Sequence, residues 1–147
     1  MNISVPFTVN GSGTATGGGT DYAISASPLV INAGSTSATC TITITPDVLD
    51  EYNETVIVDL GTPTNATLGT TTSHTATITD DDAMPAVSFT AASQSSAAES
   101  GTLTITAQLS AVSGRDVTVP FSVNGSGTAT GGGTDYSITV SPVTIAE

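Results

Sequence analysis

The sequence has almost no basic residues. Arg115 is the only one and lysine is absent, whereas 13 residues are Asp or Glu. The net charge of -12 at pH 7 excludes nucleic acid and anionic membrane surfaces as electrostatic partners. Cys40 is the only cysteine, so no intrachain disulfide can form. No apolar run approaches membrane-spanning length, and we expect no membrane insertion.

Side chains that commonly carry catalysis are also scarce. Tryptophan is absent. His74, the only histidine, has no nearby Cys, nucleophile-elbow Ser or second His in the sequence, so we find no Ser/His/Asp or Cys/His arrangement. Paired carboxylates can cleave glycosides, but the chain has little aromatic surface on which a sugar could stack. The sequence therefore predicts a protein that is not an enzyme.

The chain contains a long internal repeat. Residues 5–22 and 119–136 differ at one position of eighteen, Thr8 against Ser122, and a weaker match continues to Ile31 and Ile145. The offset of 114 residues is typical of a whole small domain repeated in tandem. We interpret residues 1–82 as the C-terminal part of one repeat, its strands C to G. Residues 83–147 would then be the N-terminal part of the next repeat, its strands A to D.

Short alternating runs, rich in Thr and Val, predict strands with one polar face and almost no helix. These runs, separated by turn signals, predict an immunoglobulin-like antiparallel β-sandwich with about seven strands per repeat. Its core should be thin, with Cys40 among the buried residues. The runs cover residues 3–9, 22–31 (interrupted by Pro28), 37–45, 54–60, 75–79, 86–90, 102–109, 116–123 and 136–145.

The acidic residues are clustered between the predicted strands. Alternate loops of a sandwich lie at the same end, so these carboxylates should converge at one pole, where almost no basic residue is present to neutralise them. Calcium, a hard cation with six to eight oxygen ligands in loose geometry, is the natural counter-charge. Magnesium demands stricter geometry, and zinc prefers His and Cys. The competing interpretation is that these acids are solvated turn residues.

Three ordered motifs and one longer segment carry a family resemblance. They are Gly19-Thr20-Asp21-Tyr22, Asp47 through Glu51 to Glu54-Thr55, Ile78-Thr79-Asp80-Asp81-Asp82, and residues 86–110. Together they resemble the Calx-beta domain family over nearly the whole chain. The resemblance implies a β-sandwich that holds calcium through the acids of its loops. Carried over by position, the calcium ligands would be Asp21 or Asp135, Asp47, Glu51, Glu54, Asp80, Asp81, Asp82 and Glu99. Pro46 departs from relatives with a second acid there, and Asp50 is an additional acid without an assigned role.

These observations together predict a calcium-binding structural module of a repetitive extracellular or cell-surface protein, an adhesin or a filament. Calcium would rigidify the repeats and their junctions. Two alternatives stay open. The family also includes regulatory calcium-sensing domains of a sodium/calcium exchanger, and a ligand-binding adhesin module needs no metal. Half-saturation near micromolar calcium favours a sensor, and near millimolar calcium a scaffold.

The phase of the repeat makes a further prediction about partners. The strands of residues 37–79 need an A–B hairpin beside them, and residues 86–109 are the only such segment in the sequence. The hairpin could come from the same chain or from a neighbouring copy, and we favour the second. Donation between copies would build fibres or swapped dimers. A ligand of the parent protein on a cell surface or matrix is a further possible partner.

Overall fold

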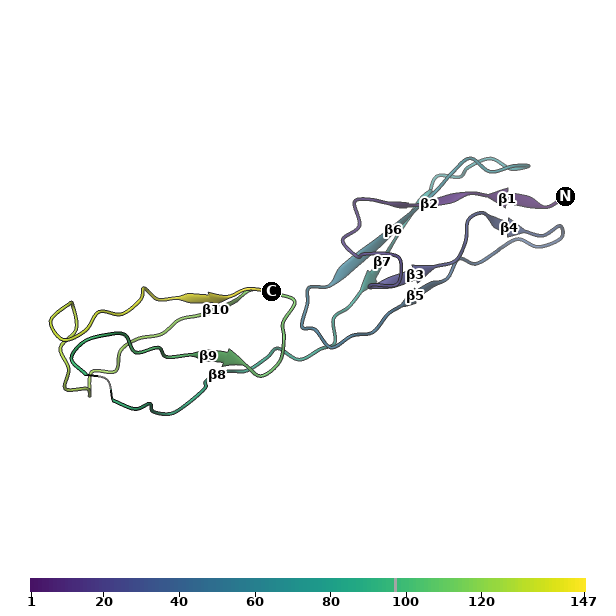
Figure 1. Cartoon of the computed structure of the whole chain (residues 1–147). Coiled ribbons are helices and arrows are strands. Elements are labelled where there is room, and N and C mark those ends of the chain that lie inside the picture. The colour runs from purple at the N-terminus through teal and green to yellow at the C-terminus, as the bar shows by residue number, and fades with distance from the viewer. Residues whose placement is uncertain (97) are drawn as a thin grey trace. The chain divides into compact units, whose positions relative to one another are not determined.

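The computed structural model describes residues 1–96 and 98–147, and its regular elements there are all β-strands. None of the described residues forms a helix that is long and apolar enough to cross a membrane. Contacts divide the chain into two compact units, and Figure 1 shows the strands of each. The first unit comprises residues 1–48 and 52–81, and the second comprises residues 49–51 and 82–147. Each unit is described by itself below.

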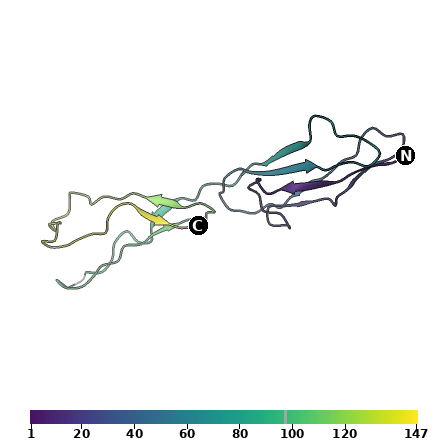
Figure 2. The same ribbon diagram turned by 90° about the horizontal axis from the view of Figure 1, so that it is seen from above.

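The first unit is a set of short antiparallel strands. Its strands are β1 (Ile3–Val5), β2 (Phe7–Asn10), β3 (Tyr22–Ile24), β4 (Leu29–Ile31), β5 (Ile42–Ile44), β6 (Glu54–Leu60) and β7 (Ser73–Ile78). They pair as a three-stranded sheet β2-β6-β7 and as two pairs, β1-β4 and β3-β5. In Figures 1 and 2 these strands run along the length of the unit. The all-β antiparallel fold predicted from the period-two pattern is confirmed.

Two of the predicted long strands are each divided by a proline. Pro6 separates β1 from β2, and the two strands take different partners, β4 and β6. Pro28 likewise precedes β4 within the predicted strand 22–31. Proline has no N–H to offer a neighbouring strand, so the chain can change partners at that position. By contrast, β6 has the predicted bounds of residues 54–60.

The core of the first unit is small and lies where its sheets meet. Phe7, Tyr22 and Val56 are its buried hydrophobic side chains, and Val56 is 1 % exposed. Phe7 begins β2 and pairs with Leu60, while Val56 lies in the central strand of the three-stranded sheet. Cys40 was predicted to be buried, and this is wrong. It is half-buried, and its Sγ accepts a hydrogen bond from Ser25 Oγ over 3.5 Å.

The second unit contains two separate hairpin-like pairs. β8 (Val87–Phe89) pairs with β9 (Ala107–Leu109), and β10 (Val117–Val119) pairs with β11 (Val143–Ile145). β10 and β11 repeat the pairing of β1 with β4, at the same register: Val117 lies opposite Ile145 as Ile3 lies opposite Ile31. The predicted strands 116–123 and 136–145 are therefore only partly formed.

Comparison with the first unit explains why the predicted strands 116–123 and 136–145 are only partly formed. Residues 121–124 and 136–138 correspond in sequence to β2 and β3. In the first unit, β2 pairs with β6 and β3 pairs with β5, and the sequence of the second unit contains no copy of β6 or β5. An extended segment needs a partner strand to form a ladder of backbone hydrogen bonds and to cover its side chains. Phe121 and Tyr136 are consequently only half-buried, whereas Phe7 and Tyr22 are buried.

Candidate functional site

Asp21 closes the Gly-rich loop between β2 and β3. One of its carboxylate oxygens, Oδ2, accepts a hydrogen bond from the backbone N–H of Thr16, and its own N–H donates to the Thr16 carbonyl over 3.0 Å. Gly18 and Gly19 lie within the turn and have φ values of 81° and 94°, which residues with a side chain rarely adopt. The loop is thus built around the carboxylate, and the half-buried Asp21 is held in place by its own backbone.

The second unit repeats the hydrogen bonds that close this loop. Asp135 Oδ2 accepts a hydrogen bond from Thr130 N over 2.7 Å, and Asp135 N donates to the Thr130 carbonyl over 2.9 Å. Gly132 and Gly133 have positive φ values, as their counterparts do. Because the loop forms even where the flanking strands do not, its conformation is encoded locally. Both predicted ligands, Asp21 and Asp135, therefore have defined positions.

Backbone pairing gathers several predicted ligands of the first unit at one end. Asp21 directly precedes β3, and its carbonyl accepts a hydrogen bond from Thr45 N over 2.9 Å, two residues before Asp47. Glu54 begins β6 opposite Ile78, the last residue of β7, and Asp80 N donates to Asn53 Oδ1 over 3.0 Å. The segments of Asp47 and Glu54 are thus anchored by backbone pairing, and the segment of Asp80 is anchored by a hydrogen bond to the Asn53 side chain.

The Gly-rich loop connects these two pairs of segments. Ala15 N donates to the Thr55 carbonyl over 3.1 Å, while the next residue, Thr16, bonds Asp21. Thr55 N in turn donates to Thr14 Oγ1 over 2.9 Å. The start of β3 and the start of β6 therefore lie on either side of one loop. Gly13 is needed at this approach, because a Cβ there would lie 2.6 Å from the Thr55 carbonyl oxygen.

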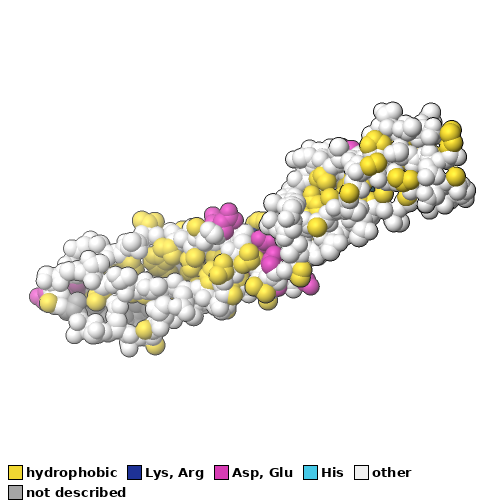
Figure 3. Space-filling view, turned by 45° about the vertical axis from the view of Figure 1, so that its right-hand side comes forward, with side chains coloured by type: hydrophobic (Ala, Val, Ile, Leu, Met, Phe, Trp, Pro, Cys, Tyr) yellow, Lys and Arg dark blue, Asp and Glu magenta, His cyan; other side chains and the backbone are white. Residues whose placement is uncertain are grey.

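Side chains do not follow the backbone into a cluster. Among residues 1–96 and 98–147, no group of three or more His, Cys, Asp or Glu side chains is close enough to hold a metal ion. The predicted ligands are distributed as follows: Asp21, Glu51, Glu54, Asp80 and Asp82 are half-buried, and Asp47, Asp81, Glu99 and Asp135 are exposed. Figure 3 shows acidic side chains in a few small groups on an otherwise largely uncharged face.

The predicted ligands have the oxygen donors that calcium prefers, but their side chains are not arranged around a single ion. Carboxylate and backbone oxygens are the ligands that calcium takes, and these residues offer little else. A site would require the loop carboxylates to draw together from their present positions. In such a site Asp21, Glu54 and Asp80 would be the natural anchors within the first unit, because main-chain hydrogen bonds or strand pairing already fix their segments.

Asp50 has a clear structural partner that sequence reasoning missed. Asp50 is 5 % exposed and its side chain forms an ion pair with Arg115, whose Nε donates to Asp50 Oδ2 over 3.2 Å. Ser113, also 5 % exposed, forms an isolated parallel β-bridge with Asp50, and Gly114 N donates to the Asp50 carbonyl over 3.2 Å. The only basic side chain is thereby used in a polar cluster of the second unit. The lone Arg115 among 13 acids was the available signal, but it does not identify the acid.

Gly114 completes the cluster through its lack of a side chain. A Cβ at this position would lie 2.6 Å from Cγ and 2.7 Å from Oε1 of Glu51. Glu51, a predicted calcium ligand, is therefore held next to the Asp50–Arg115 pair. Within the second unit, Asp50 is neutralised by arginine.

Comparison of the sequence with protein families gives one match, found twice. The Calx-beta domain matches residues 2–82 and again residues 80–145. The chain belongs to the Calx-beta family. The two matches share residues 80–82, the Asp triplet. Comparison with curated proteins and with solved structures gave no match.

Membership of the family establishes the fold class of the chain and its general association with calcium. Calx-beta domains are β-sandwiches, which agrees with the small antiparallel sheets of both units. They are non-catalytic domains associated with calcium. The two adjacent matches are consistent with tandem repeats, as the offset of 114 residues indicates.

Proposed function

We propose that this chain is a calcium-binding structural module of a repetitive extracellular protein, a surface adhesin or a filament. Calcium would bind the loop carboxylates, stabilise each Calx-beta unit by mass action and stiffen the junctions between repeats. The near-identity of residues 5–22 and 119–136 supports a repetitive array, because an array needs many equivalent units. The role is mechanical rather than catalytic.

The observation that carries this proposal is the excess of acidic over basic residues, many of them in loops with defined positions. The chain has 13 acids and one base, and Asp50 already uses that base. One basic side chain cannot balance 13 acids, so the chain keeps a net charge of -12 at pH 7. Self-repulsion among like charges destabilises a compact state, and a divalent cation relieves it most directly. Most of these acids occupy the positions that the family resemblance identifies as ligands.

The arrangement of the carboxylates favours a scaffold over a sensor. The described residues hold no preformed group of three ligands, so part of the binding free energy would be spent on drawing loops together. Extracellular calcium modules bind at roughly 10⁻⁴–10⁻³ M, whereas sensors bind at roughly 10⁻⁷–10⁻⁵ M. A weak site is useful only where calcium is abundant, which is the extracellular space.

Isothermal titration calorimetry of the whole chain with calcium, and separately with magnesium, tests this function. We expect calcium to bind with a dissociation constant of roughly 10⁻⁴–10⁻³ M and magnesium to bind more weakly. Asp80→Asn/Asp82→Asn should weaken calcium binding at least about tenfold, which corresponds to about 1.4 kcal/mol. Asp116→Asn removes a carboxylate outside the proposed set and should leave binding unchanged.

Three outcomes count against the proposal. Absence of any calcium-specific heat would make the acids solvated turn residues and leave a metal-free adhesin module as the better account. An equal loss in the Asp116→Asn control would show that calcium responds to net charge alone. A micromolar dissociation constant would keep calcium binding but favour the sensor.

A further inference from the structure

Arg115 is the one residue of this chain that proteases of trypsin specificity recognise. Such a protease binds an arginine or lysine side chain through a carboxylate in its specificity pocket, and it hydrolyses the peptide bond that follows that residue. The 147 residues include no lysine and no other arginine. The bond between Arg115 and Asp116 is therefore the single bond of the chain at which this class of enzyme can act.

The guanidinium of Arg115 is already bound by a carboxylate of the chain itself. Arg115 Nε donates to Asp50 Oδ2 over 3.2 Å, and Arg115 Nη2 donates to Asp50 Oδ1. This two-point contact is the geometry in which arginine binds a carboxylate most strongly. Only 26 % of the Arg115 side chain is exposed. Asp50 thus occupies the group that the specificity pocket of a protease needs to bind.

The backbone on both sides of the bond after Arg115 is also held in place. On the N-terminal side, Ser113 is 5 % exposed, and Gly114 N donates to the Asp50 carbonyl over 3.2 Å. Arg115 N donates to Ser113 Oγ over 3.2 Å. On the C-terminal side, β10 begins and pairs with β11. A protease acts on a segment that has opened locally, so this segment must first leave its partners.

The residues that cover this segment come from a distant part of the sequence. Asp50 and Arg115 are 65 positions apart, and residues 49–51 lie in the second unit. Asp50 supplies both the carboxylate and a backbone carbonyl. Glu51 lies against Gly114, where a Cβ would be 2.6 Å from the Glu51 Cγ. Residues 49–51 therefore fit the turn through an ion pair, a backbone hydrogen bond and close packing on a glycine.

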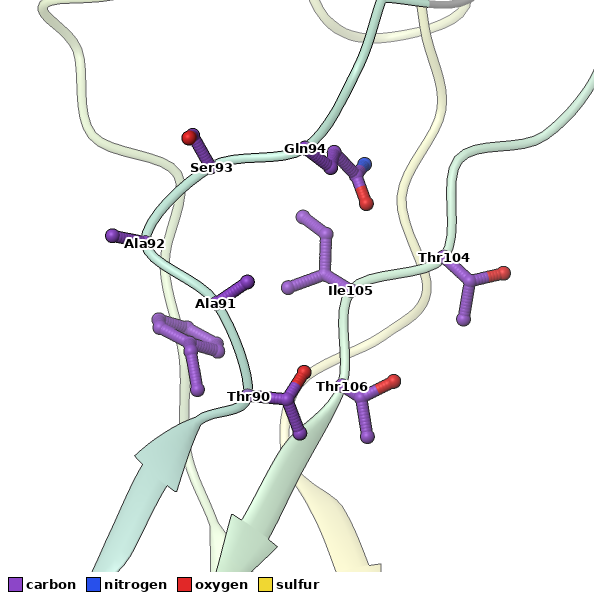
Figure 4. A pocket seen from close by; sticks show the side chains of 9 residues that line it. Thr90, Ala91, Ala92, Ser93, Gln94, Thr104, Ile105 and Thr106 are labelled. Atoms are coloured by element: carbon purple, nitrogen blue, oxygen red, sulfur yellow. The ribbon is translucent and has the colours of Figure 1, made fainter.

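Protection of this kind is not general in the second unit. Phe89 and Ile105 are 63 % and 65 % exposed, and both line a pocket between residues 89–94 and 104–106. Figure 4 shows Ile105 directed into this pocket, and Thr104 and Thr106 directed away from it. A protease that recognises apolar side chains therefore finds exposed targets in the same unit. The contacts around Arg115 protect one bond and not the unit as a whole.

We propose that residues 49–51 form an intramolecular mask over a proteolytic site, the bond between Arg115 and Asp116. The partner that the mask excludes is a serine protease with a carboxylate in its specificity pocket. When the mask leaves, the enzyme hydrolyses this bond: one water is consumed, Arg115 gains the carboxylate and Asp116 gains the amino group. The products are residues 1–115 and 116–147. No metal takes part, so the proposal stands or fails independently of calcium binding.

Limited digestion with trypsin, without added metal, tests the mask. A synthetic peptide of residues 110–119 gives the rate at the unprotected bond, and mass spectrometry identifies the products. The unchanged chain should be cleaved at least about a hundredfold more slowly than the peptide, because cleavage requires prior opening. Asp50→Asn should be cleaved at least about tenfold faster than the unchanged chain, because the charge-assisted contact is lost. A chain that is cleaved as fast as the peptide would overturn the proposal.

Two controls separate loss of the mask from other effects. Glu147→Gln removes one negative charge from an exposed residue of the same unit and should leave the trypsin rate unchanged. Chymotrypsin recognises apolar side chains, and it should cleave the unchanged chain and Asp50→Asn at similar rates. If Asp50→Asn speeds both proteases equally, the substitution unfolds the unit instead of removing a mask, and the proposal is wrong.

A second pair of variants keeps both Asp50 and Arg115. Gly114→Ala places a Cβ against Glu51 and should displace the mask, so that trypsin cleaves at least about tenfold faster. Gly114→Ala/Glu51→Ala removes the obstructing atoms and should restore slow cleavage. A peptide of residues 110–119 with the same alanine corrects for the preference of the protease at position 114. If the second substitution does not restore protection, residues 49–51 are not the mask.

Discussion

At the scale of single residues, Arg115 shows how a rare side chain is used. It pairs with Asp50, which is the most buried acid among the described residues and is not one of the predicted calcium ligands. Removing one partner of a buried pair leaves an uncompensated charge, which costs more than the pair itself contributes. Asp59 is a second acid with defined partners, and it accepts hydrogen bonds from the uncharged side chains of Ser73 and Asn10.

Arg115→Ala should destabilise the second unit by about 2 kcal/mol, because Asp50 then keeps its charge in a largely buried position. Asp50→Ala should have a similar effect. The double variant should be clearly less unstable than the sum of the two single variants predicts. Urea unfolding of all four proteins gives the coupling free energy of this cycle. Additive effects would mean that the pair contributes nothing to stability.

Asp59 should give the first unit an acid-sensitive contribution to stability. Hydrogen bonds from Ser73 and from Asn10 hold the pKa of Asp59 below its ordinary value, the latter through Asn10 Nδ2 and Asp59 Oδ2 at 2.7 Å. A pKa that is lowered on folding stabilises the folded state above the unfolded pKa, and this stabilisation is lost as pH falls through the folded value.

The loss should therefore occur below about pH 4, the ordinary range of an aspartate. Urea unfolding in chelator between pH 7 and 2 should show a shallower acid limb in Asp59→Asn than in the unchanged chain. Asp81→Asn, an exposed position with the same loss of charge, serves as the control. Parallel curves for the unchanged chain and Asp59→Asn would contradict this account.

At the scale of elements, local sequence determines the loops, whereas partner strands determine the strands. The Gly-rich loop has the same hydrogen bonds in both units, with Asp21 and Asp135 in equivalent positions. The strand segments on either side of it are formed only in the first unit, where β5 and β6 are present. A loop closed by its own side chain needs no outside partner, and a strand does.

Gly18→Ala should destabilise the first unit by about 1 kcal/mol, because Gly18 has a φ of 81° that an L-residue adopts at a cost. Gly11→Ala in the same loop should be close to neutral, since a Cβ there meets no atom within 4 Å and Gly11 is not among the glycines of positive φ. Thermal unfolding of the two variants separates backbone strain from loss of glycine as such. Equal destabilisation would contradict the argument.

At the scale of the whole molecule, the sequence predicted the class of fold well and the details unevenly. Period-two alternation predicted the antiparallel strands and the bounds of β6, and the ordered motifs of residues 19–22, 47–55 and 78–82, with the segment 86–110, carried the resemblance to the Calx-beta family. The split of strands at Pro6 was missed, because only tertiary pairing reveals that β1 and β2 have different partners. Cys40 followed the alternation but is only half-buried, which a pattern within one strand cannot reveal.

The candidate site was predictable in its backbone more than in its side chains. Loop order placed Asp21, Glu54 and Asp80 on segments that main-chain hydrogen bonds or strand pairing do anchor. Whether carboxylates converge depends on the side-chain positions and on the counter-charge, and motif spacing contains neither. The Asp50–Arg115 pair was equally inaccessible, because its members are 65 positions apart in the sequence.

The most direct test of the central claim is thermal unfolding of the whole chain across a calcium titration, with magnesium and chelator as controls. Binding at 10 mM calcium with a dissociation constant of about 1 mM would add about 1.4 kcal/mol per ion, and thus several degrees in Tm. We predict that rise with calcium and a clearly smaller one with magnesium, with a midpoint near millimolar. An unchanged Tm, or the same rise with both ions, would contradict a calcium-stabilised scaffold.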